Sequence, residues 1–268
     1  MMCSPQNQQD NSDFLSPIMI AQLDAALARL DGAQTIELAY QELKAIGRAL
    51  GMPLLIWSPD VARPVFDRNM DNFFREEGWS AEVLGLWWER TVMLKSPLYI
   101  RCRTAALPFV TVTRDNIPKR PAELRKMSLA IDAMNVRSLI TVPVHLPRGL
   151  VAMLSWGGPQ DKPQAQAILA QVRPSLIAAG HLTMAAFAQS SAALRSSEEE
   201  LARLTPREWE CLRLTAQGCR EETVAATIGL GSTTVRYHLD NVVRKLGASN
   251  RTHAVALAAQ LGLLGPIG

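Results

Sequence analysis

Apolar residues recur every three or four positions in the first fifty residues of the chain. One repeat starts near Pro17 and is interrupted at Asp31 and Gly32, and a second runs from Ile36 to Leu50. This spacing puts apolar side chains on one face of an α-helix, and glycine commonly follows a helix end. The pattern therefore predicts two amphipathic helices near the N-terminus.

Later segments alternate between strand-like and helix-like patterns. Four short runs rich in β-branched and apolar residues are expected to be strands, at 53–57, 109–113, 139–146 and 150–156. The last two are joined by Pro147, Arg148 and Gly149, a turn sequence that predicts a hairpin. Helices are expected at 79–94, 121–134 and about 164–190. Helices around antiparallel strands predict an α/β/α sandwich over 15–185.

Two stretches lack an apolar repeat. Residues 1–14 are rich in Gln, Asn, Ser and Asp, so they are expected to be a disordered lead-in and not a secretory signal. Residues 186–203 are small, polar and charged, and they are expected to link two domains. Only helical patterns follow in 204–268. The predicted fold class is thus α+β: an N-terminal α/β/α sandwich with an antiparallel sheet, and an all-α C-terminal domain with a four-helix helix-turn-helix.

Signals for helix ends are clear in the C-terminal segment. Thr205 suits an N-cap, Pro206 suits the first helical position, and Glu208 completes a capping box. Beyond Gly218, helices are expected at 221–228, 232–246 and 250–261, with a tight turn at 229–231. A short helix, a glycine-bearing turn and a longer helix form the geometry that places the longer helix in the major groove of DNA.

The longer helix carries side chains suited to double-stranded DNA. Its N-terminal half offers groups that suit base edges: Thr233, Thr234, Arg236 and Tyr237. Basic side chains further along suit phosphates: His238, Arg244, Lys245 and Arg251. Residues 201–268 hold eight Lys and Arg against five Asp and Glu, so the basic excess lies largely where DNA would lie. The competing interpretation is a helical bundle with a solvated basic face.

Bulk composition narrows the function classes only slightly. A formal net charge of +3 does not by itself indicate a nucleic-acid partner. No apolar run approaches the roughly 20 residues that span a bilayer, so no membrane partner is expected. Four scattered cysteines favour reduced thiols in the cytoplasm. The four histidines show neither metal-ligand spacing nor a catalytic triad, so neither an enzyme nor a cofactor is predicted.

A series of fixed spacings runs through the C-terminal segment. It consists of Leu204-Thr205-Pro206-Arg207-Glu208, Leu212, Gly218, Thr234-Val235, His238, Lys245-Leu246 and Asn250-Arg251. These residues resemble the LuxR-type helix-turn-helix. The resemblance implies a transcription factor that binds inverted-repeat DNA as a homodimer, with dimer contacts from the last helix, here Ala254 to Leu261. RNA polymerase is a further candidate partner.

Shorter matches lie in the N-terminal domain. They are Ser96-Pro97, Leu107-Pro108, Thr141-Val142-Pro143, Arg148-Gly149 and Leu154-Ser155. Together they resemble the autoinducer-binding domain of quorum-sensing LuxR regulators, which implies control of quorum-sensing or virulence genes. That family binds acyl-homoserine lactones with a tyrosine, two tryptophans and an aspartate.

The lactone-anchoring positions of that family are changed here. Counted from the Ser96-Pro97 match, the aspartate position is Ser96 and the lactone-binding tryptophan position is Thr111. The tyrosine position is Trp79, and the other tryptophan position is Val83. A hydroxyl in place of a carboxylate loses a charge-assisted hydrogen bond of about 1.5–3 kcal/mol. The changes therefore predict that ordinary lactone binding is lost.

Other pocket candidates keep the ligand question open. Thr141 and Ser155 are retained at positions that face the acyl amide in the family, although such residues are more often ordinary sheet residues. Trp79, Trp87 and Trp88 are expected either to line the pocket or to fill it, and filling is favoured. The leading hypothesis is a dimeric DNA-binding regulator without ordinary lactone binding. The alternative is a regulator that senses a lactone or another small apolar signal.

Two hypotheses from other classes have less support in the sequence. A phosphorylated response regulator would need acidic strand ends, and the expected strand at 53–57 leads only into Ser58-Pro59-Asp60. An enzyme would need a nucleophile near His145, and no such pattern is present.

Overall fold

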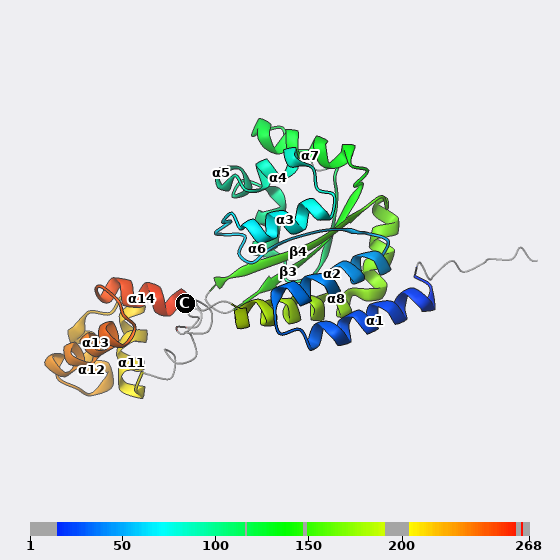
Figure 1. Ribbon diagram of the computed structural model, residues 1–268. Helices are drawn as coiled ribbons and strands as arrows, with labels where there is room; N and C mark the ends of the chain where they lie inside the picture. Colours follow the sequence, from blue (N-terminus) through cyan, green and yellow to red (C-terminus); the bar gives the residue numbers. More distant parts are fainter. Residues whose placement is uncertain (1–14, 116, 147–148, 191–203, 261–263, 265–268) are drawn as a thin grey trace, which may run out of the picture. The chain divides into compact units, whose positions relative to one another are not determined.

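The computed structural model describes residues 15–115, 117–146, 149–190, 204–260 and 264. The predicted lead-in at 1–14 and most of the predicted linker at 186–203 lie outside these residues. The chain divides into an N-terminal unit that extends to Ser190 and a C-terminal unit from Ser191 onward, with the short Leu146–Leu150 segment grouped with the latter. Figure 1 shows the helices and strands of both units.

An antiparallel sheet forms the centre of the N-terminal unit. Within the described residues it has four strands in the order β1-β4-β3-β2. Their bounds are β1 Leu54–Ser58, β2 Phe109–Val112, β3 Ser138–His145 and β4 Val151–Gly158. The predicted hairpin is confirmed, because β3 pairs with β4 and Thr141 lies opposite Ser155. Every predicted strand is therefore present, with ends shifted by one or two residues.

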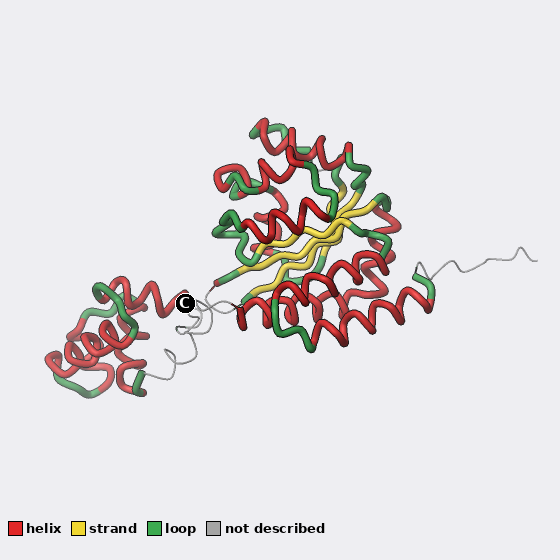
Figure 2. The backbone as a smooth tube through the Cα atoms, viewed as in Figure 1, coloured by secondary structure: helices red, strands yellow, loops and turns green. Residues whose placement is uncertain are grey.

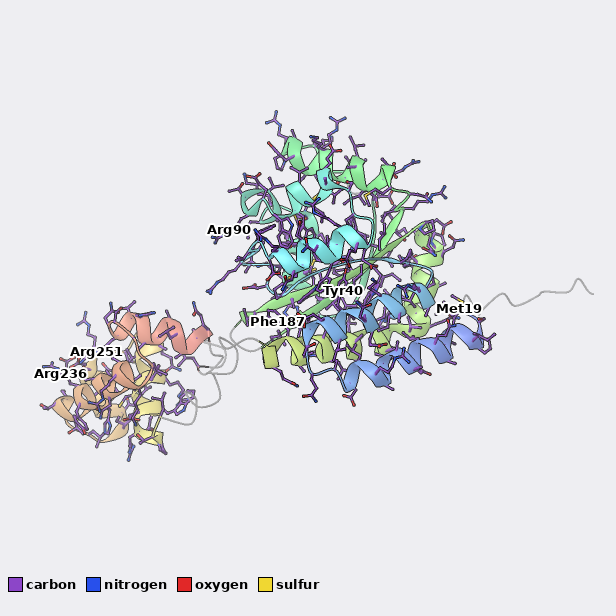
Figure 3. All side chains as sticks on the ribbon, in the orientation of Figure 1. Met19, Tyr40, Arg90, Phe187, Arg236 and Arg251 are labelled. Carbon is purple, nitrogen blue, oxygen red and sulfur yellow. The ribbon has the colours of Figure 1, made fainter. Side chains whose placement is uncertain are left out.

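Three helices lie on one side of this sheet. They are α1 Pro17–Asp31, α2 Ile36–Ala49 and α8 Lys162–Ser190. Two of them, α2 and α8, contact the strands, and α1 packs on these two helices. Trp156 of β4 is fully buried and its indole nitrogen donates to the carbonyl of Leu43 on α2, at 2.9 Å. Phe187 lies near the end of α8 (Figure 3). Its ring is edge-on to that of Trp57, with ring centroids 5.6 Å apart. Aromatic side chains, of which Trp57 and Trp156 are fully buried, thus join the sheet to this helical layer.

A second group of helices covers the opposite face (Figure 2). Its members are α3 Arg68–Glu76, α4 Ala81–Trp87, α5 Arg90–Met93, α6 Pro97–Thr104 and α7 Ala122–Ala133. The single helix predicted at 79–94 is wrong, because the chain leaves helical geometry at Glu89, where ψ is 96°. The break lets Trp88 bond Asp71, at 2.6 Å, while Trp87 stays on the buried side. Helices on both faces confirm the α/β/α sandwich.

The C-terminal unit is built from helices α11 Pro206–Ala216, α12 Glu221–Ile228, α13 Ser232–Lys245 and α14 Arg251–Gln260. The predicted capping box at Thr205 and Glu208 is confirmed in both directions. Gly229 ends α12 in the left-handed region, with φ of 69°, where a side chain would be strained. The predicted helix-turn-helix and the α+β fold class are thus confirmed.

Candidate DNA-binding surface and interior cavity

One side of α13 anchors the helix in the C-terminal unit. Val235 and Leu239 are buried in a cluster with residues of α11 and α12, and Val242 is buried in a second cluster with α14. These three residues are three or four positions apart, so they form one face of the helix. The opposite face of α13 is therefore fixed in an outward orientation.

The outward face of α13 presents most of the predicted base-contacting side chains. Thr233, Thr234 and Arg236 are exposed, and Tyr237 is 64% exposed although it is aromatic. His238 is half-buried, with its ring centroid 5.9 Å from that of Tyr237. The helix thus brings together the residues predicted for base contacts on one solvent-facing surface.

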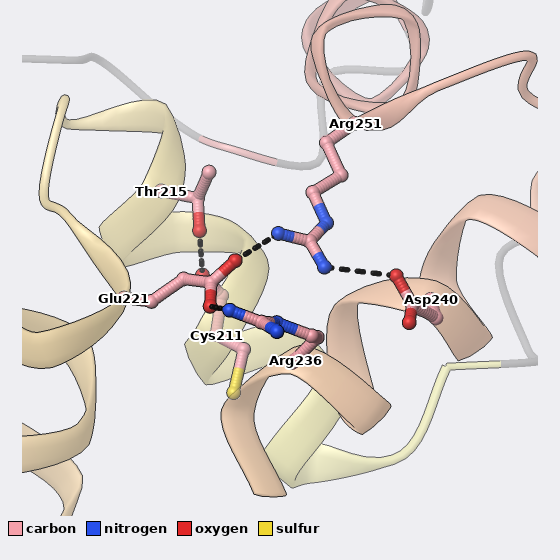
Figure 4. A network of polar contacts seen from close by, with 6 residues as sticks. All are labelled: Cys211, Thr215, Glu221, Arg236, Asp240 and Arg251. Atoms are coloured by element: carbon pink, nitrogen blue, oxygen red, sulfur yellow. Dashed lines mark hydrogen bonds and ion pairs between the residues drawn. The ribbon is translucent and has the colours of Figure 1, made fainter. Parts of the chain in front are cut away.

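Two of the predicted DNA-contacting arginines take part in an ion-pair network within the C-terminal unit (Figure 4). Arg236 of α13 donates through Nε and Nη2 to Oε2 of Glu221, at 3.1 and 3.0 Å. Arg251 of α14 donates to the other oxygen of Glu221 and, at 2.9 Å, to Oδ1 of Asp240. Hydrogen bonding from Arg251 is the main cause that lowers the pKa of Glu221. The network joins α12, α13 and α14.

Lys245, another predicted phosphate contact, also has an acidic partner. Its ammonium lies 2.7 Å from Oε2 of Glu208, whose side chain is only 4% exposed. Burial acts to raise the pKa of Glu208, but hydrogen bonds from Lys245 and Thr205 outweigh it, so the pKa lies below its ordinary value. Arg244 is exposed and bonds only the amide oxygen of Asn241, at 2.7 Å, among the described residues. Phosphate contact by Arg244, Lys245 and Arg251 stays a prediction.

A partly open cavity of about 130 Å³ lies in the N-terminal unit, between the sheet and the second group of helices. Most of its lining is apolar, and its polar groups are chiefly hydroxyls with one arginine, Arg101. No carboxylate belongs to the described residues that line it. Five of the seven predicted pocket residues line this cavity: Trp79, Val83, Trp87, Ser96 and Thr111.

The side chains at the changed anchoring positions have distinct surroundings. The indole nitrogen of Trp79 donates to the carbonyl of Leu55, at 2.7 Å, so its polar atom is occupied while its ring borders the cavity. Ser96 is buried at the start of α6 and makes no capping hydrogen bond to that helix. Trp87 is 4% exposed and lies edge-on to Tyr99. Of the three tryptophans expected to line or fill the pocket, Trp79 and Trp87 line the cavity, and Trp88 is not among its described lining residues.

The other two predicted pocket residues, Thr141 and Ser155, face each other across the β3–β4 hairpin. Both are fully buried, and their hydroxyl oxygens lie 2.7 Å apart. They are not part of the lining found among the described residues. The structure does not place these two residues at the cavity, and their role as ligand contacts stays a prediction.

Arg101 is a cavity residue that the sequence patterns do not identify. Its guanidinium lies 4.0 Å from the ring centroid of Phe109 and donates to the carbonyl of Val110, at 3.3 Å. An arginine on a helix that was not itself predicted gives no periodic signal.

None of the helices in the described part of the chain has the length and apolar character to cross a membrane.

Comparison with family models assigns both units. Residues 202–258 match the model for bacterial regulatory proteins of the luxR family, and residues 36–187 match the autoinducer binding domain. The second match covers more than half of the chain.

Similar proteins come from several bacteria. The chain is 31% identical to the transcriptional activator protein AhyR of Aeromonas hydrophila over 243 residues, which cover 90% of this chain and 86% of AhyR. It is 30% identical to the transcriptional activator protein BjaR1 of Bradyrhizobium diazoefficiens over 202 residues, or 75% and 79% of the two chains.

Solved structures show the same fold. The chain matches the crystal structure of Escherichia coli SdiA with a TM-score of 0.59 and 18% identity, over 92% of this chain and 99% of SdiA. Another SdiA structure holds octanoyl-rac-glycerol and gives the same TM-score. With an autoinducer-binding domain and a helix-turn-helix domain in one chain, this protein belongs to the LuxR family of quorum-sensing transcriptional regulators and is not an enzyme.

Proposed function

We propose that this regulator binds palindromic DNA as a homodimer, with α13 of each subunit in the major groove of one half-site. The observation that supports it best is the outward face of α13, where Thr233, Arg236 and Tyr237 are exposed on a helix with a fully packed opposite side. One such helix contacts few base pairs, whereas a dimer doubles the contact and matches a two-fold symmetric site. We place this activity in the cytoplasm, with RNA polymerase as a partner.

Dimer contacts in the C-terminal unit would come from the exposed side of α14. Ala254 and Ala258, within the segment predicted for dimerisation, are buried against α11 and α13. Ala256, Ala259 and Gln260 are exposed on the same helix. Analytical ultracentrifugation of the full chain, with and without a bound duplex, tests for the dimer, and a single copy per palindromic site contradicts it.

We further propose that the N-terminal unit dimerises the protein and does not bind acyl-homoserine lactones in the ordinary way. The lining of the cavity supports this, because its described residues offer hydroxyls such as those of Ser96 and Thr111 and no carboxylate to accept a ligand amide. Differential scanning fluorimetry with a panel of lactones of different acyl length is the test. No ligand is expected to raise the melting temperature, and a large rise would show that a lactone binds the native state.

The cavity itself favours a second candidate function, a response to a small apolar ligand. Its volume of about 130 Å³ approaches that of an engineered protein cavity of roughly 150 Å³ that binds benzene. A drug-sized ligand requires roughly 300 Å³ or more, so a larger signal would require side chains such as Trp87 to move. The same fluorimetry assay with small aromatic and short alkyl compounds separates the two candidates.

A further inference from the structure

The outward face of the recognition helix carries an acidic residue. Thr233, Tyr237, Asp240 and Arg244 follow one another at intervals of four, three and four residues, and all are exposed. These intervals place them on one stripe of α13. The side chain of Asp240 is 63% exposed in this stripe, one turn beyond Arg236. A carboxylate thus lies within the surface proposed to meet DNA.

A free carboxylate at this position would weaken DNA binding, because phosphates repel it. Here Arg251 of α14 donates from Nη2 to Oδ1 of Asp240, at 2.9 Å. No hydrogen bond to the second carboxylate oxygen, Oδ2, is found within the part of the chain that the structure describes. The negative charge is therefore compensated by Arg251 while one oxygen remains available to accept a hydrogen bond.

The bond to Arg251 also fixes the position of the carboxylate. The other side of the Arg251 guanidinium bonds Glu221, and Glu221 in turn bonds Arg236 (Figure 4). Arg251 is itself two-thirds buried, with 33% of its side chain exposed. An acceptor, Asp240, and a donor, Arg236, are thereby held one turn apart on the same helix by a shared network.

We propose that Asp240 is a specificity-determining residue that accepts a hydrogen bond from the exocyclic amine of cytosine in the major groove. Among base edges in this groove, cytosine presents a donor where guanine presents acceptors, and Asp is a suitable partner for the cytosine amine. Arg236 is suited to a guanine in the same half-site. The inference rests on the proposed insertion of α13 into the major groove.

A purely structural role for Asp240 makes a different prediction. If its function is only to hold Arg251, then Asp240→Asn keeps an oxygen for that bond and leaves the base preference unchanged. If Asp240 reads cytosine, the amide in Asp240→Asn presents a donor and an acceptor that suit adenine. Asp240→Ala presents neither group. The two variants therefore separate reading of a base from support of the helix.

The experiment is selection of DNA from a randomised duplex library by the full-length protein, followed by affinity measurements on all single-base changes of the selected site. The wild type is expected to prefer a C·G pair at one position of each half-site by about tenfold. Asp240→Asn moves that preference toward A·T, and Asp240→Ala abolishes it. Glu210→Gln is the matched control, because Glu210 is a partly exposed acid paired with Arg207 on α11 and its replacement is expected to leave the preference intact.

Two results overturn the inference and are distinguishable. If both Asp240 variants keep the wild-type preference at every position, the assignment of Asp240 is wrong while the proposed DNA-binding function stands. If the wild type enriches no sequence at all, the proposed function fails and the assignment fails with it. Circular dichroism melts of each variant, matched to the wild type, confirm that a changed preference comes from a folded protein.

Discussion

The recognition helix and the cavity of the N-terminal unit differ in the polar side chains that they present. On α13 charged groups are paired and held, as Arg236 is by Glu221, yet remain at the surface. In the cavity the polar groups are mainly neutral hydroxyls such as those of Ser96 and Thr111, bordered by tryptophans and aliphatic side chains. The comparison teaches that one chain can hold paired charges on the surface of its helix-turn-helix while the described lining of its cavity holds neutral hydroxyls and no carboxylate.

The largest effect is expected at the buried carboxylate of the C-terminal unit. Glu208→Ala removes the partner of Lys245 and half of the capping box at Thr205. Removal of one member of a buried pair leaves the other charge uncompensated, so we expect a loss of about 2–4 kcal/mol in the stability of this unit. Urea denaturation of the full chain, with separate probes of the two units, measures it. An equal loss in the N-terminal unit contradicts the account.

A fall in pH should lower the stability of the C-terminal unit. The pKa values of Glu208 and Glu221 are both lowered below the ordinary 4.5, the first by hydrogen bonds that outweigh burial and the second chiefly by Arg251. Groups with lowered folded-state pKa values contribute stability that is present above 4.5 and is lost as the pH falls through the folded values. Melts of the C-terminal unit between pH 7 and pH 3 should show a constant stability down to about pH 5 and a decline below it. A stability that rises on acidification excludes this linkage.

Arg236→Ala is expected to cost about 1–3 kcal/mol in binding to a specific site and to relax base preference. The reason is that the guanidinium is exposed on the outward face and is suited to guanine. Electrophoretic mobility shifts on the selected duplex and on random duplex provide the measurement. Equal weakening on both duplexes would show that Arg236 contacts phosphate instead of a base.

Alanine substitutions at two N-cap positions, one in each unit, are expected to change stability by smaller amounts. Thr205 accepts from the backbone of Glu208, so Thr205→Ala is expected to destabilise the C-terminal unit by about 1 kcal/mol. Ser96 occupies the N-cap of α6 but makes no capping bond, so Ser96→Ala should change the N-terminal unit by less than about 0.5 kcal/mol. Chemical denaturation measures both, and a larger effect at Ser96 would indicate a polar role for this hydroxyl inside the cavity.

The smallest expected effect is a difference in the salt dependence of DNA binding between variants of two neighbouring cations. Arg244 is exposed and bonded to a neutral amide, whereas Lys245 is paired with Glu208. We therefore expect Arg244→Ala to reduce the slope of log affinity against log salt by about 1, the value for one phosphate contact. Lys245→Ala should reduce it less while lowering the melting temperature. The reverse order of slopes would make Lys245 the phosphate contact.

The sequence predicts much of the fold because its elements have strong local signals. The hairpin of β3 and β4 has long apolar runs around a turn, and the capping box at Thr205 is a short motif with a fixed spacing. Helices α3 and α6 are missed because neither has a sustained apolar repeat; α3 starts at an N-cap, Asp67, and ends in charged residues. The break at Glu89 depends on tertiary contacts of Trp88 with Asp71, which no local pattern contains.

In the candidate sites too, the sequence predicts local features but not contacts between distant residues. The outward face of α13 follows from helical spacing, so its exposed residues are predicted by the sequence. Arg251 is paired with Glu221, 30 residues away, and Lys245 is paired with Glu208, 37 residues away. These ion pairs form only in the folded unit, so no local sequence pattern predicts them. Likewise, the hydrogen bond between Thr141 and Ser155 depends on the strand register across the hairpin, which no local sequence pattern contains.

The most direct measurement of the central claim is sequencing of the duplexes that the purified full-length protein retains from a random pool at low ionic strength. The account predicts inverted repeats with half-site centres about one helical turn apart, enriched by the wild type and enriched less by Arg236→Ala. Retention of no duplex, or of sequences without two-fold symmetry, would contradict it.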